Sequence, residues 1–270
     1  MKAPFVTAVC LVALAFTGVA LAGPGPTSPL YLTYTFDRNG GNSIVVVQGN
    51  SFTSFAEAYG APDEVPIAVA GDVRTSGNSS TTIGGQYSLA GTPTGTTYVL
   101  PAIPSTAYDS TTDGSHNYLV DYTYGGVYQT ARDFTNPVAL FTSTGLYNLG
   151  ITYDPANNSL WISGWGNTTV TDYSLSGTVI TSFDTGHYFN GALAMDPATH
   201  TLWLVDDENT FTLEQYSTAG VLLSSGPYVG YSLGGEFDMG ATPTPEPGTL
   251  VMFGTGILGL AGMLRRKINL

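Results

Sequence analysis

An internal repeat in the second half of the chain constrains the fold more than any other feature of the sequence. The segment 150–162, GITYDPANNSLWI, recurs at 192–204 as ALAMDPATHTLWL, with a constant offset of 42 residues. In each copy the Asp-Pro-Ala sequence favours a type I turn, because proline presets φ and the aspartate side chain accepts hydrogen bonds from nearby backbone N–H groups. The apolar residues on either side favour strands. Each copy therefore predicts a strand, a turn and a second strand.

A second motif follows each copy. The pattern Tyr-Ser-x-x-Gly begins at Tyr173 and Tyr216, occurs again at Tyr87, and has a looser form at Tyr122. The gaps between these four tyrosines are 35, 51 and 43 residues, with a mean of 43, so we expect one shortened and one lengthened unit. A period of about 40 to 45 residues with roughly four strands per unit is typical of β-propeller blades.

The remaining sequence favours strands and turns. Its apolar stretches are short and rich in β-branched and aromatic residues, and Gly, Asn, Asp and Thr clusters separate them. We therefore expect an all-β domain over residues 23–240, built as a propeller-like array of about five repeats of ~43 residues. The pattern in 147–231 resembles blades of the NHL/YVTN-like propeller group. Residues 27–240 hold about five units of this length, which fits five blades or a divergent six. No Asp-Pro turn precedes Tyr87, so a β-sandwich and an incomplete solenoid-like stack stay open.

The N-terminal segment predicts export. A positive start, Met1-Lys2, is followed by an apolar run over 5–21 that ends with small residues, Ala20 and Ala22, at positions −3 and −1 of a cleavage site. This arrangement is typical of a secretory signal peptide over 1–22, removed by signal peptidase after the chain enters the secretion machinery. The single cysteine, Cys10, lies within it, so we expect no thiol in the mature chain.

The C-terminal segment predicts a membrane helix. A Pro/Thr-rich linker over 241–249 precedes fifteen uncharged residues at 250–264 and a basic tail at 265–270. A helix of that length spans about 22 Å, short of the roughly 30 Å hydrocarbon core, so we expect a transmembrane helix that anchors weakly. The basic tail should stay in the cytoplasm, which leaves 23–247 outside.

These C-terminal features resemble the PEP-CTERM sorting domain of Gram-negative bacteria. The residues that carry the resemblance are Pro245, Glu246, Pro247, Gly248, Arg265 and Arg266, with the apolar segment between them. The resemblance covers about 25 of the 270 residues. It implies recognition by an exosortase, a membrane protease, and cleavage near the motif. It further implies transient membrane anchoring and then delivery to the cell surface or an exopolysaccharide matrix.

Composition excludes several functional classes. With 7 Lys and Arg against 20 Asp and Glu, the formal net charge is −13, which argues against binding the nucleic-acid backbone. Without a mature cysteine or lysine, thiol nucleophiles and Schiff bases are excluded. The three histidines, His116, His187 and His200, have no close mutual spacing, and no catalytic motif occurs. We therefore expect a protein that is not an enzyme, with no catalytic residues, no cofactor and no metal.

Two groups of residues are candidates for binding. Trp161 and Trp203 occupy equivalent repeat positions, so we expect them to pack within the blades, whereas Trp165 has no equivalent in the next unit and is the candidate ligand contact. The acidic run 206–209 offers oxygen ligands for a hard cation. Because it lacks the alternating spacing of a calcium loop, we expect a solvent-facing turn instead.

Three functional hypotheses remain. The first is an exported structural or interaction protein of the cell surface or exopolysaccharide matrix. The second is a carbohydrate- or protein-binding propeller module with Trp165 as a contact, for which exopolysaccharide is the candidate partner. The third is a metal-dependent propeller lactonase or lyase, which requires a bound divalent ion.

Overall fold

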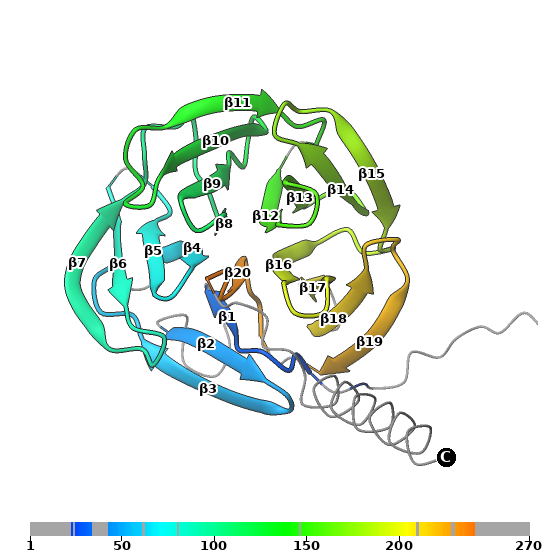
Figure 1. Ribbon diagram of the computed structural model, residues 1–270, viewed down its shortest axis with the longest axis horizontal. Helices are drawn as coiled ribbons and strands as arrows, with labels where there is room; N and C mark the ends of the chain where they lie inside the picture. The colour runs from blue at the N-terminus through cyan, green and yellow to red at the C-terminus, as the bar shows by residue number, and fades with distance from the viewer. Residues whose placement is uncertain are drawn as a thin grey trace, which may run out of the picture.

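The chain folds as a five-bladed β-propeller. The computed structural model describes residues 23, 25–33, 43–60, 63–79, 81–145, 147–208, 211–227 and 230–240, which contain twenty strands. These strands form five four-stranded antiparallel sheets around a central axis (Figure 1). An all-β propeller with five repeats is confirmed, and the six-bladed, sandwich and solenoid alternatives are wrong. The predicted signal peptide, sorting motif and helix at 250–264 lie outside the described residues, within which no helix could cross a membrane.

Each blade has an inner strand at the axis and an outer strand at the rim. From inner to outer, blade 1 holds β20 (Gly234–Phe237), β1 (Leu30–Thr33), β2 (Ser43–Gln48) and β3 (Ser51–Ala56), and blade 2 holds β4 (Glu64–Val69), β5 (Val73–Gly77), β6 (Ile83–Tyr87) and β7 (Pro93–Val99). In the same order, blade 3 holds β8 (Ser110–Thr112), β9 (His116–Val120), β10 (Gly126–Ala131) and β11 (Val138–Thr142), blade 4 holds β12 (Asn148–Asp154), β13 (Ser159–Gly164), β14 (Thr169–Ser174) and β15 (Val179–Asp184), and blade 5 holds β16 (Asn190–Asp196), β17 (Thr201–Asp206), β18 (Thr212–Ser217) and β19 (Leu222–Pro227).

Blade 1 closes the ring with both ends of the domain. Its inner strand β20 comes from the C-terminal side and pairs antiparallel with β1, with Leu30 opposite Phe237.

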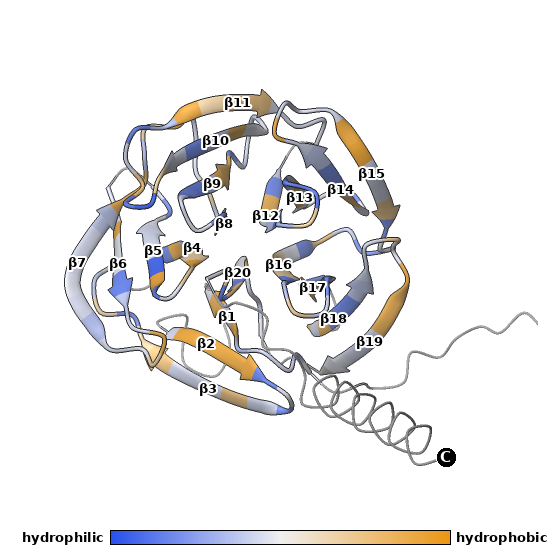
Figure 2. Cartoon of the chain, viewed as in Figure 1, coloured by the Kyte–Doolittle hydropathy of each residue, from blue (hydrophilic) through white to orange (hydrophobic). Residues whose placement is uncertain are grey.

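Apolar side chains of neighbouring blades pack against one another and form the buried core, as Trp161 of blade 4 does with Leu193 and Tyr216 of blade 5. At the rim, Figure 2 shows apolar residues continuing onto the outer strands β15 and β19, where Ile180 and Leu223 are 49% and 51% exposed. Packing between the blades therefore supplies the buried core.

The repeated turns form as predicted. The backbone N–H of Ala156 donates to Asp154 Oδ1 at 2.8 Å, and that of Ala198 donates to Asp196 Oδ1 at 2.9 Å. Each turn ends in a residue with positive φ, Asn158 and His200, both at 53°. These two hairpins, β12–β13 and β16–β17, confirm the predicted strand–turn–strand unit.

The assignment of Tyr122 to the tyrosine motif is wrong. Tyr87, Tyr173 and Tyr216 lie at the end of the third strand of their blades, whereas Tyr122 lies in the loop between β9 and β10. In blade 3 the position is held by Thr130, and the tyrosine positions of blades 2 to 5 are then 43 residues apart throughout. Measured at this position, no unit is shortened or lengthened.

Blade 3 does not show the tyrosine motif, because its turn contains neither a tyrosine nor a glycine. Gly177 donates from its backbone N–H to Ser174 O, and Phe134 donates in the same way to Ala131 O, both at 2.9 Å. Phe134 adopts φ 60°, where the motif has glycine, and its ring lies 5.8 Å from that of Tyr98 on the outer strand of blade 2. Burial of this ring offsets the strain of a left-handed backbone.

Candidate functional site

One end of the propeller carries a continuous line of aromatic side chains. The loops that lead into the inner strands and those that join the second and third strands lie at the same end of the blades, which we call the entry face. Six side chains there, the aromatic tract, make successive ring contacts at centroid distances of 5.1, 5.3, 6.1, 5.7 and 5.1 Å, in the order Tyr108, Tyr122, Tyr147, Trp165, Phe189 and Tyr231. The tract runs across blades 3, 4 and 5 to the loop before β20.

The rings at the centre of the tract are exposed to solvent, and the rings towards its ends pack against apolar side chains. Trp165 is 50% exposed and Tyr147 is 46% exposed. Other members, Phe189 and Tyr231 among them, are partly buried against an apolar cluster of Val65, Leu149 and Leu233 where the inner strands begin. An exposed aromatic surface on a packed apolar base is typical of a binding surface.

Backbone contacts fix the place of Trp165 between two blades. Its N–H donates to the carbonyl of Tyr147 at 2.9 Å, and the residue forms an isolated β-bridge with Phe189. The next residue, Gly166, adopts φ 80° and donates to Tyr188 O at 2.7 Å. In blade 5 the position is taken by Asp207, whose N–H donates to Phe189 O at 3.0 Å. The sequence expectation that Trp165 has no aromatic counterpart therefore agrees with the fold.

A groove opens between Tyr147 and Trp165. Its volume is about 510 Å³, and its polar lining includes Asn148, Asn167 and Thr169. None of the described residues that line it is charged or a histidine. Asn167 is held in place, because its Oδ1 accepts from both the N–H and the hydroxyl of Thr169, at 2.8 and 2.9 Å. The groove combines two aromatic faces with amide and hydroxyl groups, which suits a neutral ligand with both C–H and O–H surface.

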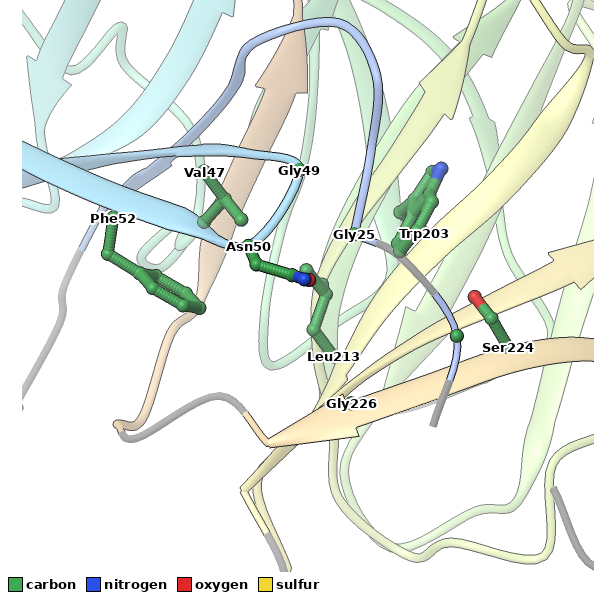
Figure 3. A pocket seen from close by; sticks show the side chains of 10 residues that line it. Gly25, Val47, Gly49, Asn50, Phe52, Trp203, Leu213, Ser224 and Gly226 are labelled. Atoms are coloured by element: carbon green, nitrogen blue, oxygen red, sulfur yellow. The ribbon is translucent and has the colours of Figure 1, made fainter. Parts of the chain in front are cut away.

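The other two tryptophans are buried packing residues, as predicted, and both pack between blades rather than within one. Trp161 is fully buried, and Trp203 is 3% exposed. Trp203 borders a second cavity of about 350 Å³ between blades 5 and 1, together with Val47, Phe52 and Leu213 (Figure 3). The N-terminal segment lines the cavity through Gly25, where a Cβ would lie 2.0 Å from the carbonyl oxygen of Gly49. This cavity is mostly apolar and is formed by interblade packing, so the blade 4 groove is the better candidate for a ligand site.

The acidic run at 206–209 is not the solvent-facing turn that the sequence suggested. Asp206 and Asp207 are only 1% and 3% exposed, while Glu208 is exposed and residue 209 lies outside the described residues. Asp207 turns inward and accepts from the Ser232 N–H at 3.1 Å. Burial raises the pKa of Asp207 well above its usual range.

Asp206 instead lies beside a histidine distant in sequence. His187 Nδ1 is 3.5 Å from Asp206 Oδ2, and its Nε2 is 3.3 Å from Glu214 Oε2. The hydrogen bond to Glu214 raises the pKa of His187, and the negative charges nearby act in the same direction. Sequence reasoning missed this group because its members lie on three segments that only the fold brings together.

Two carboxyl groups at the propeller axis were also missed. Asp109 and Glu236 are fully buried, and desolvation raises both pKa values well above their usual range. Asp109 accepts from the N–H groups of Ile151 and Gly235, each at 3.1 Å, and so connects blades 3, 4 and 1. These groups are inaccessible to a substrate, so we assign them to the architecture.

Comparisons with known proteins identify one segment of the chain and its fold. Residues 243–267 match the PEP-CTERM protein-sorting motif. The chain carries this sorting signal. It is therefore an exported protein with a C-terminal signal that an exosortase processes. The match spans all six residues that carried the resemblance, and no curated protein matches the chain.

Solved structures share the propeller architecture at low identity. A chain of the nidogen/laminin complex aligns with a TM-score of 0.54 and 14% identity, over 80% of this chain and 100% of that one. A protein of unknown function from Bacteroides thetaiotaomicron aligns at 0.50 and 12%, over 74% and 59%. Virginiamycin B lyase from Staphylococcus aureus aligns at 0.46 and 17%, over 74% and 69%. The first two likenesses support the fold and say nothing of a ligand or a reaction.

Proposed function

We propose that this protein is a non-catalytic interaction module of the cell surface or exopolysaccharide matrix that binds neutral polysaccharide in the blade 4 groove. Its route is secretion, transient anchoring through the C-terminal helix and exosortase processing in a Gram-negative bacterium. The observation that carries the proposal is the groove itself, in which Trp165 and Tyr147 present exposed rings beside the uncharged polar side chains of Asn167 and Thr169.

The chemistry of the groove matches that of a sugar ring. The C–H groups on one face of a pyranose carry partial positive charge, and the negative face of an aromatic ring attracts them. The hydroxyl groups at the sugar's edge need donors and acceptors, which Asn167 and Thr169 offer. Since the tract continues to Phe189 and Tyr231, a chain of several sugar units has further aromatic surface to follow.

Binding rather than catalysis is proposed because no carboxyl or imidazole group lies among the described residues that line the groove. Glycoside hydrolysis uses a pair of carboxyl groups on either side of the scissile bond. The lining of the groove, as far as the structure describes it, contains no aspartate, glutamate or histidine.

The test is affinity electrophoresis of the processed protein in gels that contain polysaccharide. Host exopolysaccharide and hydroxyethyl cellulose serve as probes. We expect both to retard the wild-type protein, and the Trp165→Ala variant to bind at least about tenfold more weakly, which corresponds to a stacking contribution of ~1.4 kcal/mol. Tyr124→Ala is the matched control, because Tyr124 is 60% exposed in the neighbouring β9–β10 loop and is not a member of the tract. Equal retardation of Trp165→Ala and wild type would refute the assignment.

A further inference from the structure

A second site lies in blade 5, next to the end of the aromatic tract. We infer that His187, Asp206 and Glu208 bind a divalent first-row transition metal ion at the entry face, a site that stands independently of polysaccharide binding. One ligand atom from each residue lies within 4.8 Å of the other two. His187 comes from the loop before β16, Asp206 ends β17, and Glu208 follows in the β17–β18 loop.

The imidazole is already oriented as a metal ligand. Glu214, which is 5% exposed, lies 3.3 Å from His187 Nε2 and leaves Nδ1 directed at Asp206 Oδ2, 3.5 Å away. Metal-binding histidines commonly donate their other ring N–H to a carboxylate, which fixes the tautomer and the ring orientation. Ligand atoms about 2 Å from a tetrahedral ion lie roughly 3.4 Å apart, so this pair already has suitable spacing.

Glu208 completes the cluster from the solvent side. Its Oε2 accepts from the N–H of Tyr188 at 3.0 Å, which holds the carboxylate beside the histidine. The His187 side chain is 29% exposed, so an ion can reach the cluster from solvent. Three carboxylates, on Asp206, Glu208 and Glu214, surround one imidazole, and a bound cation would balance their charge.

Blade 4 has no carboxylates at the positions of Asp206 and Glu214, so propeller packing does not require carboxylates there. Asp206 pairs with the first residue of β16, as Gly164 pairs with the first residue of β12. Glu214 pairs with Leu204, as Thr171 pairs with Ile162, its repeat equivalent. Blade 4 therefore has glycine and threonine where blade 5 has two carboxylates. In blade 4, Thr171 lines the open groove, and Gly164 lies next to residues that line it.

The donor set selects the class of metal. Calcium and magnesium prefer oxygen ligands throughout, whereas a histidine together with carboxylates suits Zn²⁺, Mn²⁺ and related ions. Three protein ligands leave a coordination position open on the solvent side.

The test is isothermal titration of the chelator-treated, processed protein with Zn²⁺, Mn²⁺ and Ca²⁺. We expect one Zn²⁺ or Mn²⁺ ion to bind per chain and to raise the Tm by several degrees, because the ion binds only the folded chain. The Glu208→Gln variant, which changes an exposed side chain, should bind that ion at least tenfold more weakly, and His187→Ala should bind it more weakly still.

The control is His116→Ala, which removes an exposed histidine that also lies beside a carboxylate, 3.3 Å from Asp113. It should bind the metal as the wild type does. Absence of stoichiometric binding, a preference for Ca²⁺, or equal weakening by His116→Ala would each overturn the inference. Gels that contain polysaccharide should retard the Glu208→Gln variant as much as the wild type. Failure of the metal-site proposal is therefore distinguishable from failure of the polysaccharide-binding proposal.

Discussion

Gly177→Ala probes how each blade is packed against the next. In blade 1 the turn between the third and fourth strands contains Gly49, with φ 57° and no atom within 4 Å of a Cβ. In blades 2, 4 and 5 this turn also contains a glycine with positive φ: Gly91 at 81°, Gly177 at 84° and Gly220 at 79°. A Cβ on each would meet an aromatic side chain from the outer strand of the preceding blade, at 2.4 Å from Phe55, 2.6 Å from Phe141 and 2.3 Å from Phe183. Blade 3 uses Phe134 against Tyr98 instead. The glycine therefore serves both the turn and the interblade contact.

The cost of Gly177→Ala has two parts. A left-handed backbone costs an alanine about 1–2 kcal/mol relative to glycine. The new Cβ also overlaps the Phe141 Cβ at 2.6 Å, and overpacking of this kind costs about 1–3 kcal/mol. We expect the free energy of unfolding to fall by roughly 2–5 kcal/mol in total.

Gly186→Ala separates the two parts. Gly186 has φ 80°, close to that of Gly177, but its Cβ would meet nothing within 4 Å, so only the backbone cost applies. Urea unfolding of both variants, monitored by circular dichroism, measures the difference directly. If the two variants lose the same stability within about 0.5 kcal/mol, the interblade role of these glycines is refuted.

Two further predictions concern stability. Glu57 is 8% exposed, and burial raises its pKa to about 8, with the charge of Glu64 adding to the shift. A raised folded pKa means that its contribution is fully present below the unfolded value of 4.5 and is lost as pH rises towards 8. Glu57→Gln should therefore match the wild type in urea unfolding near pH 4 and exceed it at pH 8.5, and parallel stability–pH curves would contradict the shift. Phe134→Gly relieves a positive φ but removes a buried ring, so we expect a net loss of roughly 2–4 kcal/mol in the same assay, and a gain would show that strain outweighs burial.

The sequence predicted the parts of the fold whose signals are local. The Asp-Pro-Ala turns and the strands follow from backbone preferences of adjacent residues, and the 43-residue period follows from the recurrence of the motifs along the chain; the structure has all three. In blade 3 the motif was wrongly assigned to Tyr122, because a threonine and a buried phenylalanine replace the tyrosine and glycine of the motif there. The ring closure by β20 left no signal, since Gly234 and Gly235 have weak strand preference and pair with a strand about 200 residues earlier.

The candidate sites were predictable only in part. Trp165 stood out because the repeat gave it no counterpart, but the rings around it come from separate loops and have no common spacing. His187 lies in the loop before β16 and Asp206 lies at the end of β17, so the metal-ligand spacing exists in space and not along the chain. The repeat offsets of 42 and 43 residues relate Gly164 to Asp206 and Thr171 to Glu214, and strand pairing agrees with both correspondences. Only the fold shows that the two carboxylates lie beside His187.

The central claim, polysaccharide binding beside Trp165, has a direct test in tryptophan fluorescence. Trp161 and Trp203 are buried at 0% and 3% exposure, whereas Trp165 is 50% exposed, so a change at the protein surface affects Trp165 first. Titration of the processed protein with host exopolysaccharide should give a saturable blue shift of the emission, and Trp165→Phe should abolish the shift while the protein remains folded. An unshifted wild-type spectrum at saturating polysaccharide, or an equal shift in the Trp165→Phe variant, would contradict the account.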